Sequence, residues 1–212
     1  MPTEEKLSKC HVIELMNKKD LDKAFDTIAL AFDNYPMYNY VFGNNSKISS
    51  IKQVYKSSVT TDKFKCVGII LDGECKAVAI FAKPSFKGVS TVPFLLKGGF
   101  KLVLKHSLGV AFRLINYENH AVKMKSKYSD ENCWYLYSLT VHPDYQHKGL
   151  ASKVMQSMLD FFDETGQSCY LETNDDSNVP LYEHLGFKLM EKGFVPKTKI
   201  VHCAMKREPK MK

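Results

Sequence analysis

The chain has 212 residues, of which 44% are hydrophobic and 25% are charged, and its formal net charge is +7. This length allows one sizeable α/β domain and argues against a second independent one, and the composition is that of a globular protein rather than a disordered or fibrous one. A charge of +7 suits anionic ligands but is too small to indicate nucleic acid by itself.

Six cysteines are scattered along the chain, and no two of them form a Cys-x-x-Cys pair. Most stand in apolar, strand-like runs, where cysteine behaves as a small core residue. This pattern disfavours a metal site or a disulfide framework and favours a reducing, cytoplasmic location. The first residues, 1–6, lack the charged-then-apolar order of a signal peptide, and no run of about 18 apolar residues predicts a membrane span.

The N-terminal part of the chain predicts a strand and two helices. Residues 10–15 are expected to form the strand. Apolar residues at 21, 24, 25, 28, 29 and 32 then recur at helical spacing, with Asp20 as the expected N-cap. A second, polar-rich helix is expected over about 47–60, on the outside of the fold.

An aromatic segment lies between these two helices. Pro36 disfavours helix at Tyr35, so the rings at 35, 38, 40 and 42 are expected around a helix break. Two interpretations stay open: the rings pack into the core beneath a loop, or they form a wall of the acceptor pocket. In the second interpretation the substrate-binding residues are Tyr35, Tyr38 and Tyr40.

The middle of the chain predicts a hairpin followed by a helical insert. The apolar runs 66–71 and 75–82 flank an Asp-Gly turn, which is a strong hairpin signal. Residues 94–127 are helical, apolar and basic, with a break at two glycines and a single acid, Glu118, against seven Lys or Arg residues. Such a stretch is typical of a membrane-surface helix or of a contact for acidic partners. We favour an inserted cap, over about 85–130, whose apolar face packs on the sheet and whose lysines are solvated.

The C-terminal part predicts alternating strands and helices, closed by a frayed tail at about 206–212. Within its short last helix, Asn178 suits the N-cap and Gly186 the C-terminal stop. The expected elements are, in order, a strand at 133–141, a helix from about 149 to Gly166, a strand at 168–173, a helix at 178–186, and strands at 187–190 and 199–205.

The turn after the strand at 133–141 is suited to an anion. Backbone N–H groups of residues 144–152 can converge at the start of the next helix, where the helix dipole is positive. Small residues at 149, 151 and 152 let a ligand approach the backbone, and Lys148 adds a cation. The turn has neither the Walker pattern nor the Gly-x-Gly-x-x-Gly pattern. It predicts binding of phosphate or pyrophosphate.

Two motifs in this half of the chain resemble the signatures of the GNAT acetyltransferase superfamily. Gln146-His-Lys-Gly-Leu-Ala151 is similar to the acetyl-CoA signature Gln/Arg-x-x-Gly-x-Gly/Ala, and Tyr182 stands four residues before Gly186-Phe187, as in the second signature. The resemblance is strongest over 133–190, to the branch that contains puromycin N-acetyltransferase, and is essentially absent over 85–130. It implies a single α/β domain over 1–212 with the GNAT fold: a mixed, mostly antiparallel, splayed central sheet flanked by helices, here with a helical insert.

The resemblance also implies an activity and a donor site. The activity is that of an N-acetyltransferase, in which the primary amine of a small molecule attacks acetyl-CoA directly in a ternary complex, without a metal. The strand end is implied to offer main-chain groups to the pantetheine arm, and the following turn to hold the pyrophosphate. The implied cofactor-binding residues are Leu139, Thr140, Val141, Gln146, His147, Lys148, Gly149, Leu150, Ala151, Ser152 and Asn178.

The catalytic residues implied by the resemblance are Tyr182 and a base. Tyr182 is the acid that protonates the departing thiolate. Many family members carry a basic Glu on the strand before the cofactor turn, but residues 134–141 contain no acid here. Glu172, at the end of the next strand, is a candidate carboxylate, and Ser138 or a water held by Tyr137 are alternatives. The base therefore stays open, with Glu172 as the candidate.

Two other functions are retained as alternatives. Transfer to a protein or peptide amine would need an open groove rather than a closed pocket. A non-catalytic acyl-CoA-binding or membrane-surface protein would agree with the missing strand Glu and the basic insert. The expected partners are acetyl-CoA and a small amine, with no nucleic acid and no membrane span, and a homodimer is left open.

Overall fold

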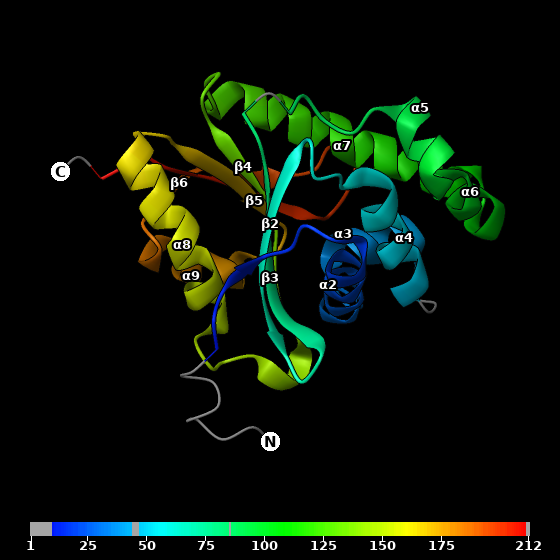
Figure 1. Ribbon diagram of the computed structural model, residues 1–212. Helices are drawn as coiled ribbons and strands as arrows, with labels where there is room; N and C mark the ends of the chain where they lie inside the picture. Colours follow the sequence, from blue (N-terminus) through cyan, green and yellow to red (C-terminus); the bar gives the residue numbers. More distant parts are fainter. Residues whose placement is uncertain (1–9, 44–46, 85, 211–212) are drawn as a thin grey trace.

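The structure is a computed structural model that describes residues 10–43, 47–84 and 86–210 (Figure 1). A seven-stranded sheet forms its centre, in the order β1-β2-β3-β4-β5-β7-β6. Every pair of neighbouring strands is antiparallel except β4 and β5, which are parallel. The mixed, mostly antiparallel sheet that the sequence predicts is therefore confirmed. The residues on which the signal-peptide expectation rests, 1–6, lie outside the described ranges.

The strands agree with the expected elements except at the N-terminal edge. That edge strand has only two residues, because the chain turns into the first helix directly after it; the prediction of a strand over residues 10–15 was too long. Between β2 and β3, Asp72 and Gly73 both have positive φ, 54° and 79°, as a two-residue hairpin turn requires. The strands are β1 (Ile13–Glu14), β2 (Phe64–Leu71), β3 (Glu74–Ala82), β4 (Trp134–Val141), β5 (Cys169–Thr173), β6 (Lys188–Phe194) and β7 (Val201–Arg207).

Three helices cover one face of the sheet: α2 (Lys18–Ala31), α3 (Pro36–Phe42) and α4 (Ile48–Ser58) (Figure 1). The predicted cap of the first of these was wrong. Asn17 caps α2, because its side chain accepts a hydrogen bond from the Asp20 N–H, which places Asp20 in the first turn. Pro36 begins α3 rather than breaking a longer helix, as a proline in the first turn can.

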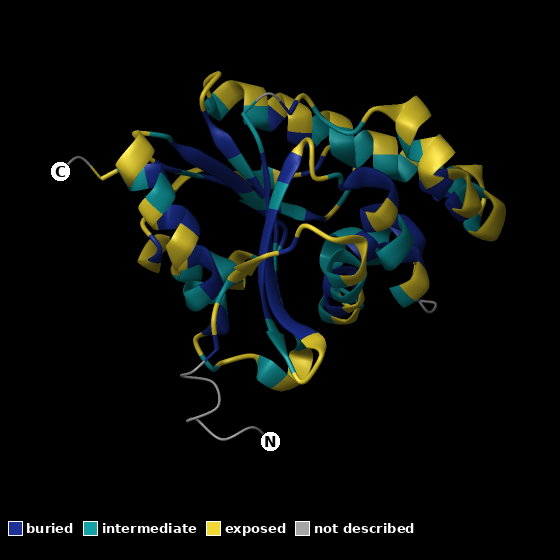
Figure 2. Cartoon of the chain, in the orientation of Figure 1, coloured by how far each residue is buried: buried dark blue, intermediate teal, exposed yellow. Residues whose placement is uncertain are grey.

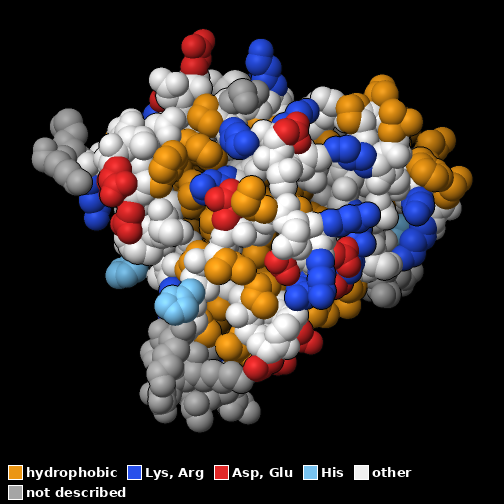
Figure 3. Space-filling model, in the orientation of Figure 1, with side chains coloured by type: hydrophobic (Ala, Val, Ile, Leu, Met, Phe, Trp, Pro, Cys, Tyr) orange, Lys and Arg blue, Asp and Glu red, His pale blue; other side chains and the backbone are white. Residues whose placement is uncertain are grey.

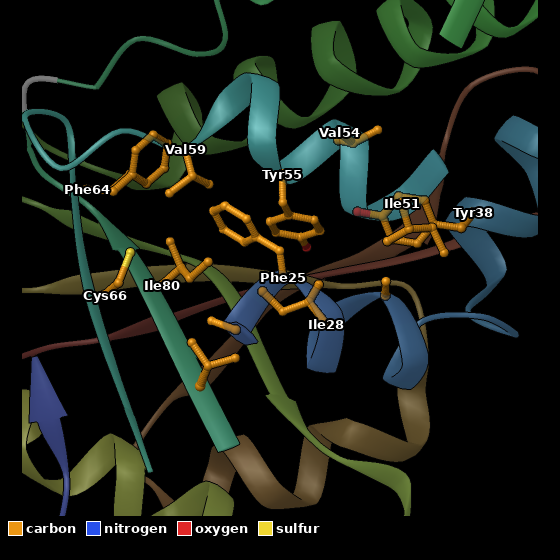
Figure 4. Packing of buried hydrophobic residues seen from close by; sticks show 14 of the residues in the cluster. Phe25, Ile28, Tyr38, Ile51, Val54, Tyr55, Val59, Phe64, Cys66 and Ile80 are labelled. Carbon is orange, nitrogen blue, oxygen red and sulfur yellow. The ribbon is translucent and has the colours of Figure 1, made fainter. Parts of the chain in front are cut away.

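Helix α4 belongs to the core and does not lie on the outside as the sequence predicted. Ile51, Val54 and Tyr55 are buried, and Figure 4 shows Tyr55 beside Phe25 and Ile28 of α2. These apolar residues recur every three to four positions, so they line one stripe of the helix. The polar residues, which led to the prediction of an outer helix, lie on the remaining faces of α4.

The opposite face of the sheet is covered by α8 (Leu150–Thr165) and α9 (Val179–His184) (Figure 1). Strand β3 serves both layers, because its side chains alternate: Ile80 faces the α2–α4 layer and Phe81 faces the α8 layer. Helix α8 ends at Gly166, which has a left-handed φ of 66°, as predicted. Burial of all six cysteines agrees with their prediction as core residues.

Four helical segments connect β3 to β4, where the insert was expected: α5 (Thr91–Phe94), η1 (Leu95–Gly99), α6 (Phe100–His106) and α7 (Leu108–Tyr128). The chain bends at Gly98, whose φ is 101°. Helix α7 buries Val110, Ala121 and Met124 and contacts α3, β5 and β7. The predicted cap is only partly right, since many apolar side chains of this stretch face outward (Figure 2).

The C-terminal strand extends further than predicted. Lys206 and Arg207, which were expected in a frayed tail, are the last residues of β7. Arg207 is buried: its Nη2 donates to Asp163 Oδ2 at 2.7 Å, and its Nε donates to the Leu185 carbonyl at 3.2 Å. This ion pair attaches the end of the chain to α8.

Two further properties concern the described residues only. None of their helices is long and apolar enough to cross a membrane. Nor do three or more of their His, Cys, Asp and Glu side chains gather where they could hold a metal ion.

Candidate active site

Strands β4 and β5 separate in the middle of the sheet. Their parallel pairing extends only from Trp134↔Cys169 to Leu136↔Leu171. On its other edge β4 pairs with β3, with a register shift that leaves Tyr137 as an extra, bulged residue. A bulge bends a strand and increases its twist, so it accounts for the departure of β4 from β5 directly after Leu136. The splay predicted at the end of this strand is present, and a cavity of about 610 Å³ opens beside it.

One end of the cavity is formed by the turn between β4 and α8. His147 and Gly149 both have left-handed φ values, 59° and 72°, which bring the chain sharply round into α8. A Cβ added at Gly149 would meet no atom within 4 Å, so the space beside this glycine is open to a ligand. Because the first N–H groups of a helix have no partner within it, this end of the cavity suits an anion.

Most of the predicted cofactor-binding residues line this cavity. Lys148 does not, because its Nζ donates to the Asp144 carbonyl at 2.8 Å and lies 5.1 Å from the centre of the Tyr145 ring. Asn178 lines the cavity, but its side chain does not cap the last helix; the Asp175 carboxylate accepts from the Ser177 N–H instead. The predicted residues that line the cavity are Leu139, Thr140, Val141, Gln146, His147, Gly149, Leu150, Ala151, Ser152 and Asn178.

The other end of the cavity is walled by tyrosines. Tyr35 and Tyr38 line it and also pack in the core with Phe42, so each of the two interpretations of the aromatic segment describes part of it; Tyr40 is half-buried against the core and does not line the cavity. Four further tyrosines join them from α4, α7 and β4, and of these the sequence had connected only Tyr137 to the site, as a residue that could hold a water. They are Tyr55, Tyr117, Tyr135 and Tyr137.

Hydrogen bonds at the end of β5 fix part of this wall. The Tyr35 hydroxyl accepts from the Asn174 N–H at 2.7 Å, and the Tyr117 hydroxyl donates to Asn174 Oδ1 at 2.8 Å. Burial raises the pKa of Tyr55 to about 12 and the pKa of Tyr38 well above its ordinary value. These phenols therefore stay neutral near pH 7 and offer ring faces and hydroxyl groups rather than negative charge.

Two glutamates face the same cavity, which Asp175 also lines. Glu172, on β5, accepts a hydrogen bond from the Tyr170 hydroxyl on Oε1 at 3.0 Å, while its buried Oε2 has no partner in the described chain. Glu118 comes from the helix α7 and also lines two smaller cavities, of about 230 and 170 Å³. Burial raises the pKa of Glu172 to about 8, with a further contribution from Glu118, and raises the pKa of Glu118 to about 7.

Glu118 is the residue that sequence reasoning missed. It was visible as the single acid in a strongly basic stretch, but the resemblance does not extend to this insert, so no motif marked it. The two alternatives to Glu172 that the sequence offered, Ser138 and a water held by Tyr137, also stand at the cavity. Ser138 lines it and accepts from the Tyr55 hydroxyl at 3.3 Å, and Tyr137 lines it as well.

Tyr182 reaches the cavity from α9. Its backbone carbonyl accepts from the Phe187 N–H at 2.9 Å, and its ring packs edge-on against Phe187 with centroids 6.0 Å apart. Gly186, at a φ of 89°, ends the helix between them. Burial raises the pKa of the Tyr182 phenol above its ordinary value, and Tyr35 adds to this effect. The phenol therefore carries its proton throughout the neutral range.

Comparison with known proteins finds similarity to acetyltransferases. Residues 109–187 match the model of the Acetyltransferase (GNAT) family. An uncharacterized N-acetyltransferase of Schizosaccharomyces pombe is 25% identical over 183 residues, which are 80% of this chain and 71% of that protein.

Solved structures share the fold at low identity. A structure of histone acetyltransferase HPA2 and related acetyltransferase from Corynebacterium glutamicum has a TM-score of 0.66 at 18% identity, with 96% of this chain and 98% of that chain covered. Arylalkylamine N-acetyltransferase 2 from Aedes aegypti has a TM-score of 0.59 at 13% identity, with 95% and 100% covered. The PaiA N-acetyltransferase of Thermoplasma acidophilum, in complex with coenzyme A, has a TM-score of 0.51 at 10% identity, with 93% and 99% covered. The fold is that of the GNAT acetyltransferases.

Proposed function

We propose that the protein is an acetyl-CoA-dependent N-acetyltransferase that transfers an acetyl group to the primary amine of a small molecule in a ternary complex. The observation that carries this proposal is the cavity where β4 leaves β5: it joins an anion-binding helix start to Tyr182 and two carboxyl groups. The match to the GNAT family model and the fold shared with a coenzyme A complex support the choice of donor.

The donor would lie along the turn and the separated strand. The N–H groups at the start of α8, beside the open space at Gly149, suit the pyrophosphate, and Asn178 is placed at the cavity wall near them. From Leu139 to Val141 the edge of β4 that faces away from β3 is not paired with β5, so main-chain groups on this edge would bond the pantetheine amides, with the Val141 carbonyl also accepting from Gln146 Nε2 at 3.4 Å. A main-chain N–H of this edge would also stabilise the thioester oxygen as negative charge develops on it.

The acceptor would lie between the tyrosine wall and the carboxyl groups of Glu118 and Glu172, which we call the carboxyl pair. A primary amine reaches the site as an ammonium ion, which aromatic faces and carboxylates attract, but it can attack the thioester only after it has lost a proton. Glu172 can take that proton on Oε2, the oxygen that has no partner in the described chain, and a pKa of about 8 suits a base that works near neutral pH. Glu118 would hold the cation and adjust the charge state of Glu172.

The Tyr182 hydroxyl would complete the transfer by donating its proton to the departing thiolate. Its pKa, raised by burial, keeps it protonated until that negative charge appears. Helices α3 and α7 cover the site. This favours a small amine over a protein amine as the acceptor, because a protein segment needs an open groove. The runs Val141-His-Pro-Asp-Tyr-Gln146 and Asn178-Val-Pro-Leu-Tyr182 resemble the puromycin N-acetyltransferase branch and support a relationship to it.

Release of coenzyme A thiol in the presence of a panel of amines tests the proposal. We expect at least one small amine to be acetylated, and Tyr182→Phe to lower kcat by about 100-fold with little change in the Kd of acetyl-CoA. Tyr128→Phe is the matched control, since Tyr128 bonds Glu191 and does not line the cavity. Absence of both turnover and acetyl-CoA binding across a broad panel would refute the proposal.

A second set of variants tests the carboxyl pair. Glu172→Gln should lower kcat by about 100-fold or more, because it removes the proton acceptor, and Glu118→Gln should chiefly raise KM for a cationic amine. Glu164→Gln, at an exposed position near the end of α8, should leave both parameters unchanged. Full activity of Glu172→Gln would remove Glu172 from the role of base.

A further inference from the structure

The outer side of the helical insert carries an unusual number of exposed apolar side chains. Leu96 is 81% exposed, Leu104 79% and Phe112 71%, and Val92, Phe100 and Leu108 are exposed as well. We refer to these six residues as the outer patch. Figure 3 shows hydrophobic side chains gathered over α5 and α6 at the upper right of the molecule, with Lys and Arg beside them. A contiguous apolar surface of this kind marks an interaction site.

The spacing of the outer patch is that of helices with one apolar side turned outward. Phe100 and Leu104 are one helical turn apart on α6, and Leu108 and Phe112 are one turn apart on α7. Between them, on the inner side, Leu102 and Val110 are buried in the core. The helices are thus held to the body of the protein by one set of apolar residues while a second set is left facing outward.

The segment that carries the outer patch has charge of one sign. Between Glu74 and Glu118 the sequence contains no Asp or Glu, whereas residues 91–115 contain Lys97, Lys101, Lys105 and Arg113. Lys101 and Lys105 follow Phe100 and Leu104 on α6, so a basic ridge runs beside an apolar one. Lys105 donates to the Ser49 and Ser50 hydroxyls, which fixes its ammonium group without neutralising it.

This charge decides between the surfaces that could cover the outer patch. In a symmetric dimer the same patch meets itself, so the lysines of one copy would face the lysines of the other. An anionic bilayer satisfies both features at once, because apolar side chains enter the interfacial region while lysines bind the lipid phosphates. No helix of the described residues is suited to span the bilayer, so the contact would be peripheral.

We propose that the outer patch, with Lys97, Lys101 and Lys105, docks the protein onto the surface of a membrane that contains anionic lipids. The inference goes beyond the proposed acetyl transfer and does not depend on it. Helix α7 connects the two regions, because it carries Phe112 in the patch and Glu118 in the cavity. Docking through the outer patch would therefore bring α7, and with it the acceptor end of the cavity, toward the lipid.

Co-sedimentation with vesicles tests the docking surface. The full chain should bind vesicles of phosphatidylcholine with phosphatidylserine, bind weakly to phosphatidylcholine alone, and be released by added salt. Changing the three lysines to Gln should weaken binding on the order of 100-fold, since each lysine near an anionic surface contributes about fivefold. Lys18, Lys188 and Lys199, exposed and outside the insert, provide a triple Gln variant of equal charge that should bind normally.

The apolar part is tested separately. Leu96→Ser, Leu104→Ser and Phe112→Ser together should abolish binding, whereas Met190→Ser with Phe194→Ser, at exposed positions of β6, should not. Circular dichroism melting verifies that each variant is folded. As a second readout, Phe112→Trp should show a blue shift of tryptophan emission, and quenching by brominated lipid, when anionic vesicles are added, because the natural Trp134 is buried.

Two results would overturn the proposal. One is the absence of binding to anionic vesicles, or binding that the patch and lysine variants leave unchanged. The other is a concentration-dependent dimer in sedimentation velocity, formed without lipid and abolished by the patch variant, which would identify a second copy of the chain as the occupant.

Discussion

The carboxyl pair of Glu118 and Glu172 makes the stability of the fold depend on pH. Their pKa values of about 7 and about 8 lie above the ordinary value of 4.5, because both groups are buried in the cavity wall. A group that holds its proton more tightly in the folded chain stabilises that chain at low pH, and this stabilisation is lost as pH rises from the unfolded pKa to the folded pKa. Stability should therefore fall between about pH 4.5 and about pH 8.

The upper part of this interval gives the cleanest measurement. The pKa of His202 is lowered to about 4 by burial, so this group makes stability rise with pH until its unfolded value of 6.5 is passed. Between about pH 6.5 and about pH 8, a group that stays protonated only in the folded chain costs about 1.4 kcal/mol of stability per pH unit. For Glu172 the loss is therefore at most about 2 kcal/mol, and for Glu118 it is less than about 1 kcal/mol. Because the cavity is open to water, we expect a loss of about 1–2 kcal/mol.

Urea unfolding followed by circular dichroism, repeated across this pH interval, measures the effect. The wild-type chain should lose free energy of unfolding as pH rises, and Glu118→Gln with Glu172→Gln should show a flatter dependence, since neither Gln can ionise. Glu164→Gln should keep the wild-type slope. An identical pH dependence in the wild type and the double variant would refute the assignment of raised pKa values to this pair.

Two further variants test the frame of the site. Asp163→Asn removes the partner of the buried Arg207 and should lower the free energy of unfolding by about 3 kcal/mol. Asp160→Asn, at an exposed position of the same helix, should change it little. Equal effects of the two variants in urea melts would contradict the buried ion pair. Gly149→Ala places a Cβ on a left-handed residue and should lower stability by about 1 kcal/mol, with Gly149→Asn tolerated better. Both Gly149 variants should also bind acetyl-CoA more weakly in calorimetry, and unchanged affinity would argue against a donor site at this turn.

Local signals predicted most of the frame. The Asp72-Gly73 hairpin and the helix that ends at Gly166 both need a positive φ, which glycine adopts readily and few other residues do. The sequence alone therefore identifies both. Caps and edges were less predictable, because several polar residues compete for each. Asn17 rather than Asp20 caps α2, and the first strand pairs over two residues only.

The site was predictable where a motif crosses it and not elsewhere. The turn at 146–152 and Tyr182 both line the cavity, and both were found from short patterns. Glu118 lines it because α7 is held across the end of β5, in part by the bond from Tyr117 to Asn174, and no local pattern encodes that contact. The exposed side of the insert is likewise a property of packing: helical spacing indicates that Phe100 and Leu104 share a side of α6 but not which side is covered.

A crystal structure of the protein with bound coenzyme A tests the central claim most directly. The account predicts the pyrophosphate within hydrogen-bonding distance of backbone N–H groups of residues 146–152, the pantetheine arm along Leu139–Val141, and the sulfur beside the Tyr182 hydroxyl, with Glu172 facing the acceptor space. Coenzyme A bound away from the β4–β5 separation, or a sulfur out of reach of Tyr182, would contradict it.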